Sequence, residues 1–116
     1  MSGIFYQIDR LGSALGATER NHRVVSQNIA NVNTPGYKTK RLEFAAMLEQ
    51  LQHADGQPPP EELPLVDAEG MTARADGNNV HLEKEVGELK KNAMVFQTYS
   101  QLLASRLATM RRAISG

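Results

Sequence analysis

Cysteine and tryptophan are both absent from this 116-residue sequence, which contains only three phenylalanines and three tyrosines. Without cysteine the chain can form neither a disulfide nor a zinc–thiolate site. Aromatic side chains bury the largest areas in protein cores, so their scarcity leaves little material for a conventional core. A chain of this length can fold as one domain, but we expect a thin core.

An excess of charge of either sign is also missing, because 13 basic side chains balance 13 acidic ones. A neutral chain has no net field that would attract nucleic acid, so we expect no nucleic-acid partner. No stretch approaches the roughly 20 consecutive apolar residues of a membrane-spanning helix. The N-terminus lacks the basic and apolar regions of a cleaved signal peptide. We therefore expect no membrane span and no general secretion.

The sequence contains no arrangement typical of catalysis or cofactor binding. His22, His53 and His81 share no metal-ligand spacing. Glu61 and Glu62 lie beside prolines, where nothing rigid would hold two carboxylates for acid–base work. Neither a glycine-rich phosphate loop nor a nucleophile elbow is present. We predict no catalytic, cofactor or metal site, and hence no enzyme.

Apolar residues near the N-terminus recur at alternating spacings of four and three, a pattern typical of coiled-coil helices. It predicts a helix from about residue 4 to residue 31. The polar residues Thr18 and His22 interrupt the apolar stripe. The residues that we predict to pack along this stripe are Ile4, Ile8, Leu11, Leu15, Val25 and Ile29.

The last third of the chain repeats this spacing and predicts a second long helix. A turn-forming cluster at residues 76–79 precedes it, and Asn79 is the best N-cap candidate. Two long helices with narrow apolar stripes predict a mainly α fold, an antiparallel coiled-coil-like hairpin of the chain ends. The predicted packing residues of the second helix are Leu82, Val86, Leu89, Phe96, Leu103, Leu107, Met110 and Ile114.

The middle of the chain shows no sustained periodicity. We expect an N-terminal helix with its closing segment over residues 1–33, an irregular and flexible segment over 34–78, and a C-terminal helix over 79–116. A short helix at 42–51 is possible, and three prolines at 58–60 predict an extended stretch. A lone helix pair buries only one stripe of each helix, so we expect a marginal monomer that neighbouring copies stabilise.

A polar segment closes the N-terminal helix and then turns at Pro35-Gly36, a pair suited to the centre of a type II turn. The segment is similar to the signature of the bacterial flagellar basal-body rod protein family. The opening of the C-terminal helix, residues 76–85, resembles that of a short proximal rod member. The signature residues are Asn28, Ile29, Ala30, Asn31, Thr34, Pro35, Gly36 and Tyr37.

The resemblance implies a structural subunit of the proximal rod, which assembles into the axial drive shaft for flagellum-dependent motility. Its partners would be copies of itself, other proximal rod proteins, the ring-to-rod junction protein and the flagellar type III export apparatus. Its place would be the periplasmic rod of the basal body, reached without a cleaved signal peptide. The alternatives are another proximal rod subunit and, in a different class, a small helical secretion chaperone or adaptor.

Overall fold

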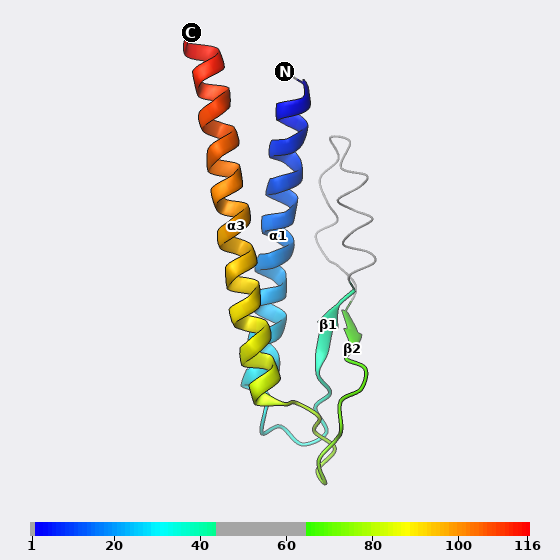
Figure 1. Cartoon of the computed structure of the whole chain (residues 1–116). Helices are drawn as coiled ribbons and strands as arrows, with labels where there is room; N and C mark the ends of the chain where they lie inside the picture. The colour runs from blue at the N-terminus through cyan, green and yellow to red at the C-terminus, as the bar shows by residue number, and fades with distance from the viewer. Residues whose placement is uncertain (1, 44–64) are drawn as a thin grey trace.

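Two long helices make up most of the computed structural model, which describes residues 2–43 and 65–116. Helix α1 spans Ser2–Ala30 and helix α3 spans Leu82–Ser115. They pack side by side and antiparallel, with both chain termini at the same end (Figure 1). The predicted helical hairpin is therefore confirmed. None of the helices in these residues is long and apolar enough to cross a membrane.

A short antiparallel ribbon lies beside the C-terminal half of α1. Strand β1 (Lys40–Leu42) pairs with β2 (Leu65–Asp67), and Arg41 is opposite Val66. Leu42 packs with Ala17 and Val24 of α1. Both strands lie inside the segment 34–78 that we expected to be irregular, and three residues each are too few to show a strand period in the sequence.

Several expectations for the middle segment fall on residues 44–64, outside the described residues. The helix considered at 42–51 begins inside β1 at Leu42, and its remainder lies almost wholly in that range. The extended proline stretch lies there entirely. The division into residues 1–33, 34–78 and 79–116 therefore stays a prediction.

The core of the described residues is small and unusually polar. Its buried apolar side chains come from two alanines, three valines and one leucine, and the largest of them is Leu42. Seven polar or charged residues are equally buried. Small apolar side chains contribute little area each, so hydrogen bonds must hold much of this interior together. The buried polar residues are Thr18, Asn28, Thr39, Asn78, Asn79, Glu85 and Asn92.

The face of α3 that meets α1 differs from the predicted apolar stripe. Glu85 and Asn92 are the buried residues of α3, and both bond to side chains of α1. Neither belongs to the predicted stripe, because a pattern of apolar residues gives no sign of a polar residue that is buried. The predicted residues that remain exposed, by 36% to 72%, are Leu82, Val86, Phe96, Leu107 and Ile114.

The other predicted packing residues lie closer to the helix interface. Val25 is fully buried in α1. The remaining ones are partly buried, and they are Ile4, Ile8, Leu11, Leu15, Ile29, Leu89, Leu103 and Met110. The hairpin thus leaves part of the predicted apolar stripe of α3 exposed, beside a partly covered seam.

Candidate site at the base of the helix hairpin

The signature segment lies at the base of the hairpin, where α1 ends and the chain turns toward β1 (Figure 1). The amide of Tyr37 donates to the carbonyl of Thr34 at 3.2 Å. Gly36, the third residue of this turn, has φ +74°. A positive φ at that position is what a type II turn requires, and glycine adopts it without strain. The predicted turn at Pro35-Gly36 is therefore observed.

A second turn, at residues 74–77, faces the first. The amide of Gly36 donates to the carbonyl of Asp76 at 2.8 Å, and that of Gly77 closes its own turn onto Arg74. Gly77 has φ +83°, and a Cβ built on it would lie 3.4 Å from the Cα of Gly36. The ammonium group of Lys38 donates to the Gly77 carbonyl. The two turns therefore pack backbone to backbone.

Asn78 ties the second turn to the end of α1. Its side-chain amide donates to the carbonyls of Asn31, at 2.9 Å, and Thr34, at 2.7 Å. Its side-chain oxygen accepts from the amide of Val80 at 2.8 Å. The last carbonyls of a helix lack partners within the helix. Asn78 supplies hydrogen-bond donors for two carbonyls just beyond that end, and so links α1 to the segment that leads into α3.

Asn79 bonds to the strand segment instead of capping α3. Its side-chain oxygen accepts from the amide of Thr39 at 2.6 Å, and its carbonyl accepts from the Thr39 hydroxyl at 3.2 Å. The N-cap of α3 is His81, which makes no side-chain capping bond. The N-cap prediction for Asn79 is wrong, because the tertiary bond to Thr39 holds its side chain.

Asn28 is the buried centre of a cluster that we call the Asn28 node: Asn28, Tyr37, Lys40, Arg41 and Glu85. Its amide donates to the carbonyl of Lys40, at 2.9 Å, and to the carboxylate of Glu85, at 3.1 Å. Its side-chain oxygen accepts from the Tyr37 hydroxyl, at 3.0 Å, and from the Lys40 amide, at 3.1 Å. These four bonds use the full capacity of an amide side chain.

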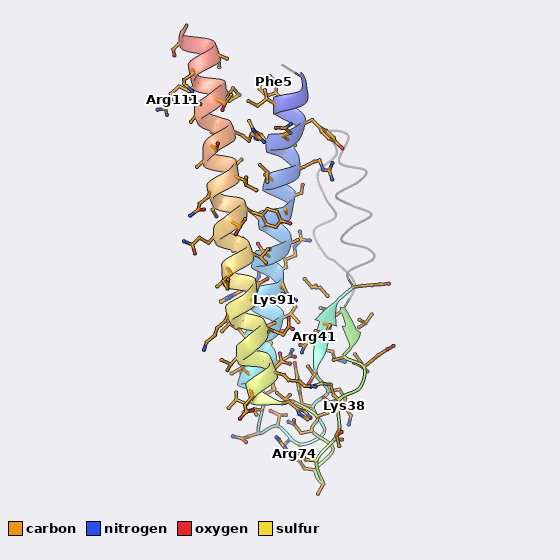
Figure 2. All side chains as sticks on the ribbon, viewed as in Figure 1. Phe5, Lys38, Arg41, Arg74, Lys91 and Arg111 are labelled. Atoms are coloured by element: carbon orange, nitrogen blue, oxygen red, sulfur yellow. The ribbon has the colours of Figure 1, made fainter. Side chains whose placement is uncertain are left out.

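Arg41 and Glu85 form the charged part of the Asn28 node. The guanidinium group donates two bonds to the carboxylate, at 2.6 and 3.0 Å, in the bidentate geometry that gives strong pairs. The Glu85 side chain is fully buried, whereas that of Arg41 is 23% exposed. Figure 2 shows Arg41 beside α3, far from the ends marked by Phe5 and Arg111. The pair fastens β1 to the first turns of α3.

Tyr37 connects the signature turn to this cluster. Burial raises the pKa of its phenol, and the Glu85 carboxylate raises the pKa further, while the Lys40 ammonium group lowers it. The phenol therefore stays protonated at neutral pH and serves as the donor to Asn28.

The arrangement is suited to holding elements of the fold together. Within residues 2–43 and 65–116, every buried side-chain nitrogen or oxygen has a hydrogen-bond partner. The same residues contain no group of three side chains that could hold a metal ion. The node's polar groups are occupied by bonds inside the chain. Its geometry fixes the signature segment, β1 and α3 to one another.

Three residues of the node, Lys40, Arg41 and Glu85, were not among the predicted site residues. Arg41 and Glu85 lie 44 positions apart, and a contact over that distance leaves no local pattern in a sequence. Of the eight signature residues, the side chains of Asn28 and Tyr37 enter the node, and Asn31 and Thr34 bond to each other at 3.0 Å. The signal that could have pointed to a polar base was the asparagine pair at 78–79, which lies shortly before α3.

Comparison with known proteins relates the chain to the bacterial flagellum. A family described as flagella basal body rod protein matches residues 8–38, which cover most of α1 and the signature segment. The chain is 30% identical over 116 residues to the flagellar basal body rod protein FlgB of Aeromonas hydrophila, with 89% of this chain and 88% of that protein covered. It is 26% identical to FlgB of Bacillus subtilis, with 94% and 93% covered.

A longer rod protein matches over a smaller share of its length. The chain is 32% identical over 89 residues to the flagellar basal-body rod protein FlgG of Caulobacter vibrioides. That alignment includes 77% of this chain but 29% of the FlgG protein. The alignments with the FlgB proteins thus cover nearly the full length of both chains, whereas the alignment with FlgG covers less than a third of the FlgG protein.

Proposed function

The chain belongs to the bacterial flagellar basal-body rod protein family, and from this membership we infer that it is a structural subunit of the proximal rod. It assembles with other rod proteins into the axial drive shaft for flagellum-dependent motility, within the flagellar basal body. The observation that carries this function is the match to FlgB proteins over nearly the full length of both chains.

The geometry of the hairpin supports a role in assembly. Its base is closed by hydrogen bonds within the chain, whereas α3 exposes apolar side chains along the predicted packing stripe, such as Leu82, Phe96 and Leu107. Burying that stripe against a neighbouring subunit would remove apolar surface from water. Contacts between unlike faces of successive copies extend into a helical tube and do not close as a pair. We propose that the predicted packing residues contribute to such contacts.

The finer parts of the role are proposals that rest on the family. We propose that the subunit has no catalytic activity, because its family is structural. We propose that it lies in the periplasmic part of the rod, contacts the ring-to-rod junction protein, and leaves the cytoplasm through the flagellar export apparatus without loss of a signal peptide. A secretion chaperone would remain in the cytoplasm, so location separates this alternative from the rod function.

Purified basal bodies provide the test. A motile strain would carry the chain with a small epitope tag in place of its own copy, and flagellar basal bodies would be isolated from it. We expect the tagged chain in the basal-body fraction at a fixed ratio to other rod proteins, and we expect deletion of its gene to abolish swimming. A chain found only in the cytoplasm, with basal bodies intact without it, would overturn the proposed function.

A further inference from the structure

A second polar contact crosses the helix interface one heptad away from the Asn28 node. The side-chain amide of Asn21 donates to the Asn92 oxygen at 2.9 Å. The Asn92 amide in turn donates to the carbonyl of Thr18 at 2.8 Å. Thr18 and Asn92 are both buried. This contact does not touch the signature segment, and the rod resemblance does not account for it.

The two polar contacts occupy equivalent positions of the heptad pattern. Asn21 and Asn28 are one heptad apart in α1, and Glu85 and Asn92 are one heptad apart in α3. Because the helices are antiparallel, Asn21 meets Asn92 and Asn28 meets Glu85 in the same alignment. We call these contacts the two polar layers. The next pair of the same series, one heptad further along, is Ala14 with Tyr99, and no side-chain hydrogen bond joins these two residues.

Sliding one helix past the other by a heptad would preserve apolar contacts but not the polar layers. In one direction Asn28 would meet Asn92, Asn21 would face Tyr99, and Glu85 would lie beyond the end of α1. In the other direction Asn21 would meet Glu85, and Asn92 would face Ala14. Each slide leaves a buried polar group without its partner, which is costly in a protein interior. The native alignment satisfies both layers.

We propose that the two polar layers specify the alignment of α1 with α3, and that the layer formed by Asn21 and Asn92 is a register determinant. The apolar stripes cannot do this alone, because a heptad repeat matches itself after every slide of one heptad. A polar pair in a coiled-coil interface is the best-attested device for this purpose, and it works at a cost in stability. The inference concerns the free chain and does not rest on the proposed function.

The fixed alignment has a structural consequence for the outer surface. A slide of one heptad displaces α3 along α1 by about 10 Å, since each residue rises about 1.5 Å. The exposed residues Phe96 and Leu107 would move by the same distance relative to the base of the hairpin. The binding of any partner that contacts both the base and these exposed residues of α3 therefore depends on this register.

The test measures the register directly in the full chain. The sequence has no cysteine, so Glu19→Cys and Ala108→Cys provide two unique nitroxide positions, both exposed. Electron–electron double resonance on labelled chain diluted with unlabelled chain reports the distance within one molecule. With Asn21 and Asn92 intact we expect one narrow distance. With Asn21→Leu and Asn92→Leu we expect a second distance, shifted by at least about 5 Å, while circular dichroism shows unchanged or higher helix content.

Two further variants make the outcome decisive. Ala14→Leu with Tyr99→Leu changes the next pair of the same series without removing a polar layer, and it should retain the single distance. Asn21→Ala with Asn92→Leu repeats the test with less added volume. An unchanged single distance in the variants that lack the layer would overturn the proposal. Loss of helix in both of them would also overturn it, because the layer would then supply stability instead of register.

Discussion

The two ends of the hairpin are built from different interactions. At the base, the end of α1, the two turns and the start of α3 are joined by a dense set of hydrogen bonds around Asn28 and Asn78. At the distal end, near both chain termini, side chains such as Phe5 and Ile114 are exposed by 50% and 72%. In the described residues, no position of α1 before Ala14 is buried, and none of α3 after Asn92.

This difference indicates a division of work between the ends. Hydrogen bonds are directional, so the base acquires one geometry within a single chain. Exposed apolar side chains gain stability only when another surface covers them, and we therefore propose that neighbouring subunits cover the distal end. The base defines the shape of the subunit, and in this proposal the distal end provides surface for assembly.

The largest expected effect, on swimming, comes from a charge placed on the exposed part of the predicted packing stripe of α3. Leu107→Asp should abolish swimming, because it places a charge in a surface that we propose to be buried in the rod. The free chain should keep its helix content, since Leu107 is 42% exposed there. Ser105→Asp adds the same charge on a different side of α3 and should leave most motility intact. Soft-agar swimming and circular dichroism measure the two properties, and normal swimming of Leu107→Asp would refute the stripe's role.

A large effect on the stability of the free chain is expected at the base. Arg41→Ala leaves the buried Glu85 carboxylate without its bidentate partner and should lower the free energy of unfolding by about 3 kcal/mol. Lys40→Ala removes the adjacent positive charge, whose pair with Asp67 is exposed, and should cost less than about 1 kcal/mol. Urea unfolding in trimethylamine N-oxide, which strengthens folding, compares the two. Equal losses would show that the node is no stronger than a surface ion pair.

The contrast between the ends also explains what the sequence could predict. Heptad spacing is a local pattern, so both helices, their antiparallel pairing and the type II turn at Pro35-Gly36 follow from it or from adjacent residues. Arg41 and Glu85 meet only after the chain folds back, and no local pattern links them. The inward face of α3 was missed for the same reason, because Glu85 and Asn92 are buried through partners that lie far away in the sequence.

Replacing glycine with alanine should change the stability of the free chain in opposite directions at the two ends of the hairpin. Gly77→Ala places a side chain at φ +83° and 3.4 Å from the backbone of Gly36, and should destabilise the free chain by about 1–2 kcal/mol. Gly12→Ala lies in the distal part of α1 with open space around it, and should stabilise the helix by up to about 1 kcal/mol. Thermal melting of the two variants measures both signs. Destabilisation by Gly12→Ala would show that the distal end is already tightly packed in the free chain.

The smallest expected effect concerns the pH dependence of the base. Burial raises the pKa of Tyr37 in the folded chain above the ordinary value of 10.0, so its contribution to stability is complete below pH 10 and is lost as pH rises through the folded pKa. Tyr37→Phe removes the hydroxyl that donates to Asn28 and should cost about 1 kcal/mol at neutral pH. It also removes the group that titrates, so its melting temperature should fall less steeply than that of the wild type as pH rises above about 10. Parallel curves for the two proteins would mean that the phenol is as free in the folded chain as in the unfolded one, and the base would then be more open than its hydrogen bonds indicate.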